Sequence, residues 1–272
     1  GVTHLCGAPI VMSMLAGATP SQRRDFPQNV SMMTAAAPPP PSVINAIEKI
    51  GISITHVYGL TEVYGPAVVC AWKPEWENLP DNERAALKAR QGVAYELQED
   101  CIVLNPETCE PVPADGKTMG EIVMRGNIVM KGYLKAPEET SSAFKNGWFW
   151  TGDLAVMHPD GYVEIQDRSK DIIISGGENI SSIEIEKILY EHPDIASVAV
   201  VAQPDEKWGE SPCAFVEPKS GKHLDDARIL EYCRQRLAGF KCPKRFIFGE
   251  LPRTSTGKIQ KNKLRDKVRQ ND

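Results

Sequence analysis

The chain has 272 residues, of which 42% are hydrophobic and 25% are charged, and its formal net charge is -5. This length is enough for two folded units, and this balance of apolar and charged residues excludes a disordered chain. The negative charge argues against a general affinity for nucleic acid. We also expect no membrane span, because no uninterrupted apolar stretch approaches the roughly 20 residues that a spanning helix needs.

Seven cysteines are scattered along the chain and form no Cys-x-x-Cys pair. This pattern is typical of reduced, mostly buried thiols in an intracellular protein, and we propose no metal site from it. The first residues carry no basic region, and the last three are not a peroxisomal Ser-Lys-Leu type signal. We expect an intracellular protein, cytoplasmic or peroxisomal, without a visible targeting signal.

The first 90 residues alternate between strand and helix patterns. Residues 29–34 and 52–55 are strand-like, and the helix between them is expected to begin with Ser42 as its N-cap and to end at Gly51. Small residues and prolines at 35–41 form the turn before this helix. The βαβ pattern predicts part of an open α/β sheet, whose strand-end turns are where nucleotides bind.

From residue 91 to residue 168 the pattern changes to short strands separated by Pro, Gly, Asn and Asp. The candidate strands are 92–98, 101–104, 120–125, 155–158 and 161–166. Such a series predicts a small β-barrel or meander. With residues 1–90 it would make up a partial large domain that ends at residue 168.

Residues 169–272 predict a compact α+β domain. Ser181 and Glu184 make a capping box that opens a helix, and Gly239 follows a second helix. Strands are expected at 197–202, 213–217 and 245–248. The fold class is therefore α/β, with a partial large domain followed by a small C-terminal domain.

The cluster Tyr-Gly-Leu-Thr-Glu at 58–62 follows a predicted strand. Gly59 allows the backbone to turn tightly, which would bring the Thr61 hydroxyl and the Glu62 carboxylate to the strand end. Oxygen ligands of this kind suit a magnesium-bound nucleotide. The alternative is an ordinary strand-to-loop turn in which Tyr58 is packed.

Thr151-Gly152-Asp153 lies between an aromatic cluster and a strand, and we expect a turn that presents the Asp153 carboxylate to a ribose diol. Arg168 follows the next strand and offers a second ribose or phosphate contact. An ordinary Gly-Asp turn and a surface salt bridge are the alternatives for these two residues.

Two further segments carry glycine. Gly176 and Gly177 follow an apolar strand and permit close approach of a ligand, although a plain tight turn into the next helix explains them equally well. Lys258 ends a polar loop that contains Thr256 and Gly257, where its ammonium suits developing negative charge. A solvated loop lysine is the alternative, and the Walker A pattern GxxxxGK[ST] is absent.

Together and in this order, these clusters resemble the C-terminal half of the adenylate-forming acyl-CoA synthetases. The resemblance covers nearly the whole chain. Residues 58–72, 73–76 and 88–92 look most like the plant-type acyl-activating enzymes for short, medium or aromatic acids.

The resemblance implies a role for each residue. The large domain would hold the nucleotide through Ala35, Ala36 and Ala37 beside adenine, Tyr58 stacked on it with Gly59 adjacent, Thr61 at phosphate, Glu62 on Mg²⁺, and Asp153 with Arg168 at ribose. Lys170 would be the hinge to the small domain. Lys258 would stabilise charge while the acyl carboxylate attacks the α-phosphate, and Gly176 and Gly177 would face CoA. The acyl pocket wall would include Val63, Tyr64 and Gly65.

The implied reaction uses ATP, Mg²⁺ and CoA: a small carboxylic acid and ATP give acyl-AMP and pyrophosphate, and the CoA thiol then displaces AMP. Residues 1–24 lack the family's Ser/Thr/Gly-rich phosphate loop, and alanines replace the commoner Gly-Gly-Ala at 35–37. We therefore interpret the chain as a fragment. Two alternatives remain: adenylation with a non-CoA acceptor, and a nucleotide- or partner-binding module without catalysis. The sequence does not indicate the oligomeric state.

Overall fold

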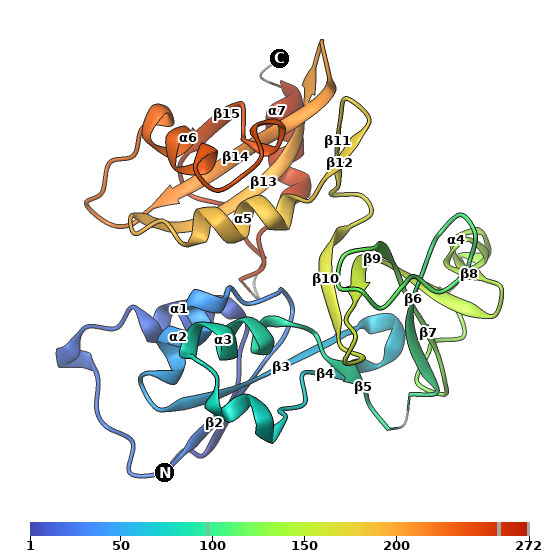
Figure 1. Cartoon of the computed structure of the whole chain (residues 1–272), viewed down its shortest axis with the longest axis horizontal. Coiled ribbons are helices and arrows are strands. Elements are labelled where there is room, and N and C mark those ends of the chain that lie inside the picture. Colours follow the sequence, from blue (N-terminus) through green and yellow to red (C-terminus); the bar gives the residue numbers. More distant parts are fainter. Residues whose placement is uncertain (97, 255–256, 271–272) are drawn as a thin grey trace. The chain divides into compact units, whose positions relative to one another are not determined.

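The computed structural model describes residues 1–96, 98–254 and 257–270. The chain divides into two compact units, Gly1–Ile165 and Gln166–Asp272, which we call unit 1 and unit 2. The division lies three residues before the position expected from the sequence. Figure 1 shows the elements of both units along the chain.

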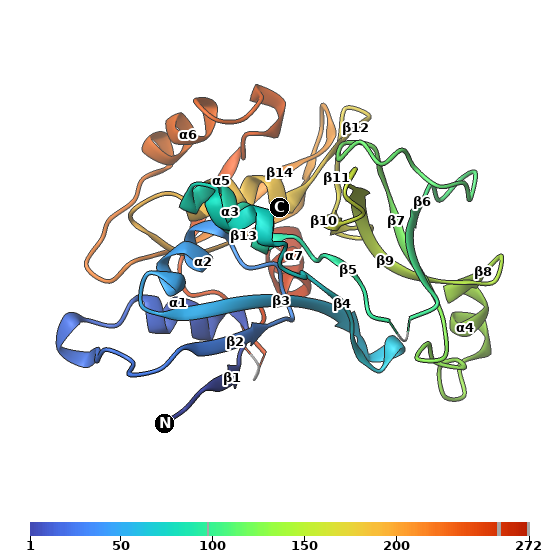
Figure 2. The same ribbon diagram turned by 60° about the horizontal axis from the view of Figure 1, so that its bottom comes forward.

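Unit 1 begins with a five-stranded sheet in the order β1-β2-β3-β4-β5. Its strands are β1 (His4–Cys6), β2 (Val30–Thr34), β3 (Ile52–Leu60), β4 (Gly65–Val69) and β5 (Val93–Ala94). β1, β2 and β3 are parallel, whereas β4 and β5 are antiparallel to their neighbours. One face is covered by α1 (Pro9–Ala16), α2 (Pro41–Glu48) and α3 (Asp81–Ala89) (Figure 2). The sequence thus predicted this βαβ portion correctly.

The helix α2 has the predicted apolar face but not the predicted N-cap. Its apolar spacing buries Ile44 and Ile47 completely against β2 and β3, as expected. The expected N-cap at Ser42 is wrong, because Pro41 is the first helical residue and Pro40 takes the cap position without a side-chain cap. Proline suits the first helical position, since the amide hydrogen that it lacks has no partner there in any case.

The second sheet of unit 1 is antiparallel, in the order β10-β9-β7-β6 with β8 paired to β9. Its elements are β6 (Asp100–Leu104), β7 (Met119–Arg125), α4 (Pro137–Ala143), β8 (Phe144–Lys145), β9 (Trp148–Met157) and β10 (Val163–Arg168). Of the strand expected at 92–98, the described residues form only β5, which pairs with β4 in the first sheet. β9 starts seven residues before the expected strand at 155–158, so it includes Thr151-Gly152-Asp153.

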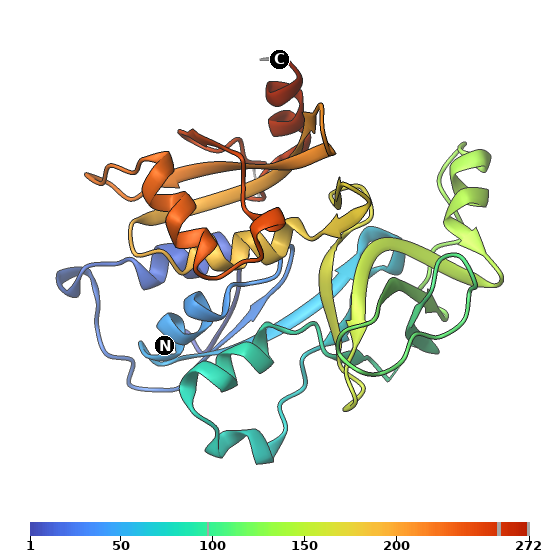
Figure 3. The same ribbon diagram turned by 45° about the horizontal axis from the view of Figure 1, so that its top comes forward.

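Unit 2 contains a sheet in the order β12-β11-β14-β13, with β15 parallel to β14. Its elements are β11 (Ile173–Ser175), β12 (Glu178–Ile180), α5 (Ser182–Tyr190), β13 (Ile195–Asp205), β14 (Gly209–Pro218), α6 (Asp226–Arg234), β15 (Arg245–Phe248) and α7 (Lys261–Gln270). The side chains of α5 and α6 pack on one face of β13 and β14, and α7 packs on the other. Figure 3 shows the two long strands crossing this unit.

The local signals in unit 2 were accurate where a cap or a strand pattern was strong. Ser181 caps α5, since its hydroxyl oxygen accepts a hydrogen bond from the Glu184 amide at 3.1 Å. β15 coincides with the expected strand at 245–248.

Short 3-10 helices occur in both units at η1 (Pro20–Gln22), η2 (Thr61–Val63), η3 (Pro74–Asn78) and η4 (Gly239–Lys241). None of the helices in the described part of the chain is long and apolar enough to cross a membrane.

Candidate functional site

The alanine turn at 35–37 begins directly after β2. Thr34, the last residue of β2, is buried, and its hydroxyl oxygen has no hydrogen-bond partner among the described residues. Ala36 has a φ of 78°, a left-handed conformation that costs a residue with a side chain about 1–2 kcal/mol. Strain of this kind is often stored at ligand sites, where the surrounding structure holds it in place. The turn is therefore a candidate site on grounds independent of the motif.

Gly59 lies within β3, and the turn that follows begins at Thr61 in η2. A Cβ atom on Gly59 would lie 1.7 Å from the carbonyl oxygen of Gly65 on β4. Glycine is thus required by the close approach of the two strands. The tight turn that we expected at Gly59 is not its reason, and the pairing of β3 with β4 shifts register between Tyr58 and Gly59 instead.

The residues expected in the acyl pocket wall face different surroundings. Val63 is almost completely buried, whereas Tyr64 is 90% exposed and has a left-handed φ of 65°. Gly65 is the first residue of β4. Of these three, only Tyr64 offers a large side chain to a ligand on the described surface.

Glu62 is held by the loop between β7 and α4. Its backbone carbonyl accepts a hydrogen bond from the Met130 amide at 2.7 Å, and its carboxylate Oε1 accepts one from the Tyr133 hydroxyl at 3.0 Å. Partial burial and the neighbouring Glu62 carboxylate raise the pKa of Tyr133, so the hydroxyl remains a donor. The Glu62 carboxylate is oriented by a residue 71 positions away.

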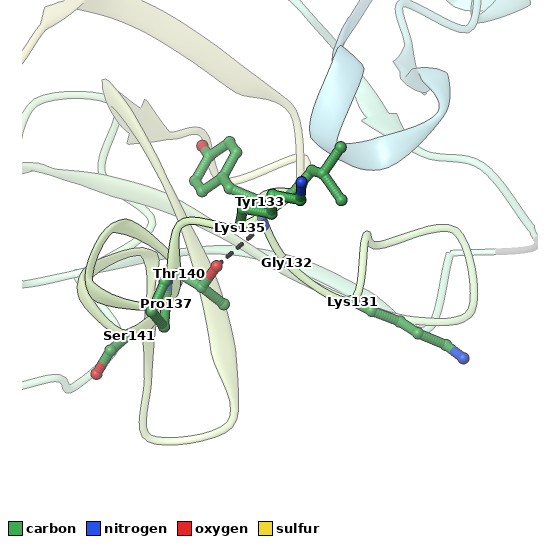
Figure 4. Close-up of a pocket in the computed structure, with 8 residues that line it drawn as sticks. Lys131, Gly132, Tyr133, Lys135, Pro137, Thr140 and Ser141 are labelled. Atoms are coloured by element: carbon green, nitrogen blue, oxygen red, sulfur yellow. Dashed lines mark hydrogen bonds between the residues drawn. The ribbon is translucent and has the colours of Figure 1, made fainter.

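The same loop borders an open pocket of about 540 Å³ (Figure 4). The pocket is lined by Lys131, Gly132, Tyr133, Leu134, Lys135, Pro137, Thr140 and Ser141. The Tyr133 amide donates to Thr140 Oγ1 at 2.9 Å, which fastens the loop to α4. Glu62 is not among the lining residues, so we do not treat this pocket as the nucleotide site.

Asp153 lies in β9 and is only 3% exposed. Its Oδ2 accepts a hydrogen bond from the Tyr58 hydroxyl at 2.6 Å, across 95 residues of sequence. The turn expected at 151–153 is wrong, because the ladder between β9 and β7 continues on both sides of these residues, with a shift of register there. The carboxylate therefore stands on a strand, beside a shift of register.

The surroundings of Asp153 contain a second carboxylate, Glu121 on β7. Its Oε1 accepts a hydrogen bond from the Gly152 amide at 2.8 Å. Burial raises the pKa of Glu121, and the charge of Asp153 adds to that rise. Burial and the charge of Asp153 likewise raise the pKa of Tyr58 well above its ordinary value, so the phenol is a proton donor at physiological pH.

Arg168 is the last residue of β10 and Lys170 lies in the short turn that follows, before β11; both belong to unit 2. The Arg168 carbonyl accepts hydrogen bonds from the amides of Asp171 and Ile172, at 2.9 and 3.1 Å. Asp167, just before the turn, is buried and accepts a hydrogen bond from the Ser182 amide at 2.5 Å. The turn that carries the expected hinge residue is therefore anchored to the start of α5.

Gly176 and Gly177 form the tip of the β11–β12 hairpin, so the expected direct passage from this turn into a helix is wrong. The Gly176 amide donates to the Trp208 carbonyl at 2.8 Å. The Trp208 ring is 44% exposed, and the Lys207 ammonium lies 4.6 Å from its centroid. An exposed indole and a cation thus accompany the glycine pair.

Lys258 lies on the far strand of a small hairpin. Arg253 and Ile259 are paired by a backbone bridge, and the Thr254 amide donates to the Lys258 carbonyl at 2.8 Å. The Lys258 side chain is exposed. Ser255 and Thr256, which complete the predicted loop, lie outside the described residues.

Tyr133, Glu121 and Trp208 were not identified from the sequence. Tyr133 and Glu121 act on residues that are distant in the chain, so no local pattern marks them. Trp208 had a signal that we did not use, because it stands between lysine and glycine in a polar stretch that offers few apolar neighbours for packing.

Two sequence models match this chain: "AMP-binding enzyme" at residues 1–134 and "AMP-binding enzyme C-terminal domain" at residues 184–258. Together they cover more than half of its residues. The chain belongs to the AMP-binding enzyme family.

The curated relatives that this chain resembles include plant CoA ligases. Acetate–CoA ligase CCL3 of Humulus lupulus is 54% identical over 99% of this chain and 49% of its own length. The peroxisomal trans-cinnamate:CoA ligase of Petunia hybrida is 50% identical over 97% of this chain and 47% of its own. The chain thus spans about half the length of the curated relatives it matches.

Solved structures agree with the assignment of this chain to the AMP-binding enzyme family. ATP-bound MatB from Rhodopseudomonas palustris matches with a TM-score of 0.82 and 30% identity, over 97% of this chain and 50% of that one. The amide bond synthetase McbA from Marinactinospora thermotolerans matches with a TM-score of 0.83 and 30% identity, over 97% and 51% of the two chains. The α/β fold predicted from the sequence is confirmed.

Proposed function

We propose that this chain is part of an ATP-dependent carboxylate–CoA ligase, an acid–thiol ligase that forms acyl-AMP and then acyl-CoA. The observation that carries the proposal is the 54% identity, over 99% of the chain, to a relative named as an acetate–CoA ligase. The substrate would be a small carboxylic acid, since the names of similar relatives specify acetate, butyrate, 2-methylpropanoate and trans-cinnamate.

In unit 1 the nucleotide would be held at the ends of neighbouring strands. The alanine turn would border adenine, and Tyr58 would stack on it while its hydroxyl keeps Asp153 in place for the ribose. The 2.6 Å bond between Tyr58 and Asp153 supports this arrangement, because it fixes both side chains before a ligand arrives. Tyr64 would form part of the acyl pocket wall with Val63 and Gly65 behind it.

The residues present fit a magnesium nucleotide. Mg²⁺ is usually bound by one or two carboxylates together with substrate phosphates and water. The described residues contain no group of three or more His, Cys, Asp or Glu that would make a complete protein cage. Glu62, oriented by Tyr133, would supply the protein oxygen, with Thr61 at the phosphate. When bound, the ion would neutralise phosphate charge.

In unit 2 the proposed roles fall on turns and on the end of β10. Lys258 would stabilise the negative charge that develops as the acyl carboxylate attacks the α-phosphate. Gly176 and Gly177 would face CoA. Arg168 would contact the ribose of the nucleotide. Lys170 would be the hinge of a small domain that starts near residue 169, since two half-reactions served by different turns of one unit require a rotation.

Acid-dependent exchange between ATP and pyrophosphate, measured with the full-length protein encoded by the same gene, tests the first half-reaction. Acetate, butyrate, 2-methylpropanoate and trans-cinnamate are the first acids to try. Lys258→Ala is expected to lower the exchange rate about 100-fold or more, because the lysine acts on charge present only in the transition state. Lys263→Ala, an exposed lysine of α7, is the matched control and should keep the parental rate.

The outcomes separate the alternatives. Parental exchange in Lys258→Ala would contradict the role of that lysine. Nucleotide binding by calorimetry without exchange for any acid would favour a binding module without catalysis. Calorimetry and exchange with the 272-residue chain itself would show whether this part acts alone.

A second candidate is adenylation followed by transfer to an acceptor other than CoA. The likeness to an amide bond synthetase, with a TM-score of 0.83, favours it specifically. Formation of the CoA thioester from acid, ATP and CoA decides between the two.

We also infer a cytoplasmic or peroxisomal location, because several relatives are named as peroxisomal. Imaging of the tagged full-length protein tests this.

A further inference from the structure

The helix α7 carries two cations on the face that it buries. Lys261, Leu264, Arg265 and Val268 are spaced i, i+3, i+4 and i+7, so they lie on one side of the helix. Leu264 and Val268 are completely buried against apolar side chains of β13 and β14. The two cations therefore sit beside the core, where a charge is costly unless it is paired.

Lys261 is paired at the start of α5. Its ammonium lies 2.8 Å from Glu186 Oε1 and donates to the Ser182 hydroxyl at 2.6 Å. The Ser182 amide in turn donates to the buried Asp167 carboxylate at 2.5 Å. Burial alone would lower the pKa of Lys261, but the charges of Glu186 and Asp167 outweigh burial and hold it above its ordinary value. The lysine is thus charged and joined through Ser182 to Asp167.

Arg265, one helical turn later, forms an ion pair with Asp171. Asp167 and Asp171 are the two ends of the five-residue segment 167–171. The segment is also closed on itself, because the Asp171 amide donates to the Arg168 carbonyl at 2.9 Å. One face of α7 therefore holds both ends of the turn that contains Arg168 and Lys170.

The N-terminal end of α7 follows Lys258 closely in the chain. The Gln260 amide donates to the Pro252 carbonyl at 2.8 Å, and the Lys263 amide donates to the Gln260 carbonyl at 3.0 Å. With the bridge between Arg253 and Ile259, these bonds close the base of the hairpin. Only two residues, Ile259 and Gln260, separate Lys258 from Lys261, and both are engaged in backbone pairing.

We propose that Lys261 and Arg265 are positioning residues that fix the Lys258 hairpin to the segment 167–171, so that the conformation of this segment sets the position of Lys258. This inference rests on the proposed function, because its consequence is stated for the proposed role of Lys258. A change of backbone conformation at Lys170 would carry Lys258 with it, and the lysine would reach the α-phosphate at one setting of the hinge. Loss of either pair would leave Lys258 present but wrongly placed.

A purely structural role predicts a different result from a positioning role. General destabilisation of unit 2 would lower both half-reactions together. A misplaced Lys258 lowers adenylate formation, which depends on it, more than thioester formation from acyl-AMP supplied ready-made. The ratio of the two rates is the discriminating quantity.

The variants are Lys261→Met and Arg265→Met in the full-length protein, with Lys263→Met as the exposed control on α7 and Lys261→Arg as the charge-retaining control. Lys261→Met and Arg265→Met are expected to lower acid-dependent pyrophosphate exchange about tenfold or more, with less than about threefold loss in thioester formation from supplied acetyl-AMP. Lys263→Met should match the parent, and Lys261→Arg should recover most of the exchange. Equal losses in the two half-reactions would overturn the proposal.

Hydrogen exchange tests the mechanical link without any enzymatic reaction. In Arg265→Met, the amides of Asp171 and of Thr254, Gly257 and Lys258 are expected to exchange faster together, although the last three are remote from the lost ion pair. Unchanged exchange in the hairpin would overturn the link. If the parent forms no adenylate, the ligase proposal fails while this measurement still decides the link. Should Lys261→Met fail to fold, Arg265→Met carries the test. Arg265 pairs with one carboxylate, Asp171, so its loss disturbs fewer buried groups than the loss of Lys261.

Discussion

The two units treat their buried polar groups differently. Among the described residues, the buried side-chain atoms without a hydrogen-bond partner all belong to unit 1: Thr34 Oγ1, Arg84 Nε, Arg90 Nε and Gln98 Oε1. Unit 2 pairs its buried charges with one another, as in Lys261 with Glu186. An unpaired buried group costs about 1–3 kcal/mol, so unit 1 carries a penalty that unit 2 avoids.

The difference follows the proposed division of labour. In unit 1 the unpaired Thr34 hydroxyl and the strained Ala36 lie two residues apart in the chain at the end of β2, where we propose that adenine binds. In unit 2 the proposed functional residues lie on turns and at the end of β10, and the buried ion pairs lie behind them. Unit 1 therefore holds unfavourable terms at its site, whereas unit 2 uses its polar groups to keep two turns in a fixed relation.

The largest expected effect contrasts one glycine from each unit. Gly59→Ala is expected to destabilise unit 1 by about 4 kcal/mol or more, because the new Cβ would meet the Gly65 backbone at 1.7 Å. Gly176 has a φ of 61°, and a Cβ added there would lie 2.8 Å from the Trp208 side chain. We therefore expect Gly176→Ala to destabilise unit 2 by about 1–2 kcal/mol. The exposed ring can move, whereas a paired strand cannot.

Urea denaturation followed by fluorescence measures both glycine variants. Four of the five tryptophans, Trp72, Trp76, Trp148 and Trp150, report on unit 1, and Trp208 reports on unit 2. Comparable losses for the two variants would mean that β4 yields as easily as the Trp208 ring, which would contradict the rigid strand pairing inferred here.

A pH experiment gives the next largest effect. Burial lowers the pKa of His56 to about 4, although hydrogen bonds to the carbonyls of Arg90 and Ala89 oppose the shift. The unfolded chain therefore binds a proton that folded unit 1 rejects between pH 6.5 and about 4. Stability from His56 is complete above pH 6.5 and is lost as the pH falls toward 4, by about 3 kcal/mol.

Two buried carboxyls of unit 2, Asp167 and Glu186, have a pH dependence of the opposite sign. Burial raises the pKa of Asp167 and Glu186 despite the opposing charge of Lys261, so the folded state takes up their protons first and is favoured as the pH falls.

His56→Gln should remove the loss of stability of unit 1 at acid pH, measured as urea midpoints at pH 7 and pH 5. His223→Gln, an exposed histidine, is the control. An unchanged acid loss in His56→Gln would show that other groups govern it.

Local patterns in the sequence predicted the elements that local forces decide. The Ser181 cap, the apolar face of α2 and the strand β15 follow from spacing and capping within a few residues. α7 was missed because only Leu264 and Val268 are apolar in it, and its other inward residues are cations with distant partners. β12 was missed because a glycine pair before a helix does not reveal that the chain first returns along β11.

The candidate site shows the same limit. Its residue types were predicted from motifs, and their roles remain proposals. The contacts that set their positions were not predictable, because Tyr58 and Asp153 are 95 residues apart and Glu62 and Tyr133 are 71 apart. Such pairs depend on which strands become neighbours, which no local pattern specifies.

The smallest predicted effect asks how much the Tyr58–Asp153 bond contributes to unit 1. Tyr58→Phe removes a donor from a buried carboxylate and should destabilise unit 1 by about 2 kcal/mol, since hydrogen bonds to charged groups contribute about 1.5–3 kcal/mol. Tyr162→Phe is the matched control, because the Tyr162 hydroxyl donates to the neutral Ala71 carbonyl at the same 2.6 Å. There we expect about 1 kcal/mol. Urea denaturation gives both values; equal losses would mean that Asp153 finds another donor, and the phenol would then contribute nothing particular to holding the proposed ribose carboxylate.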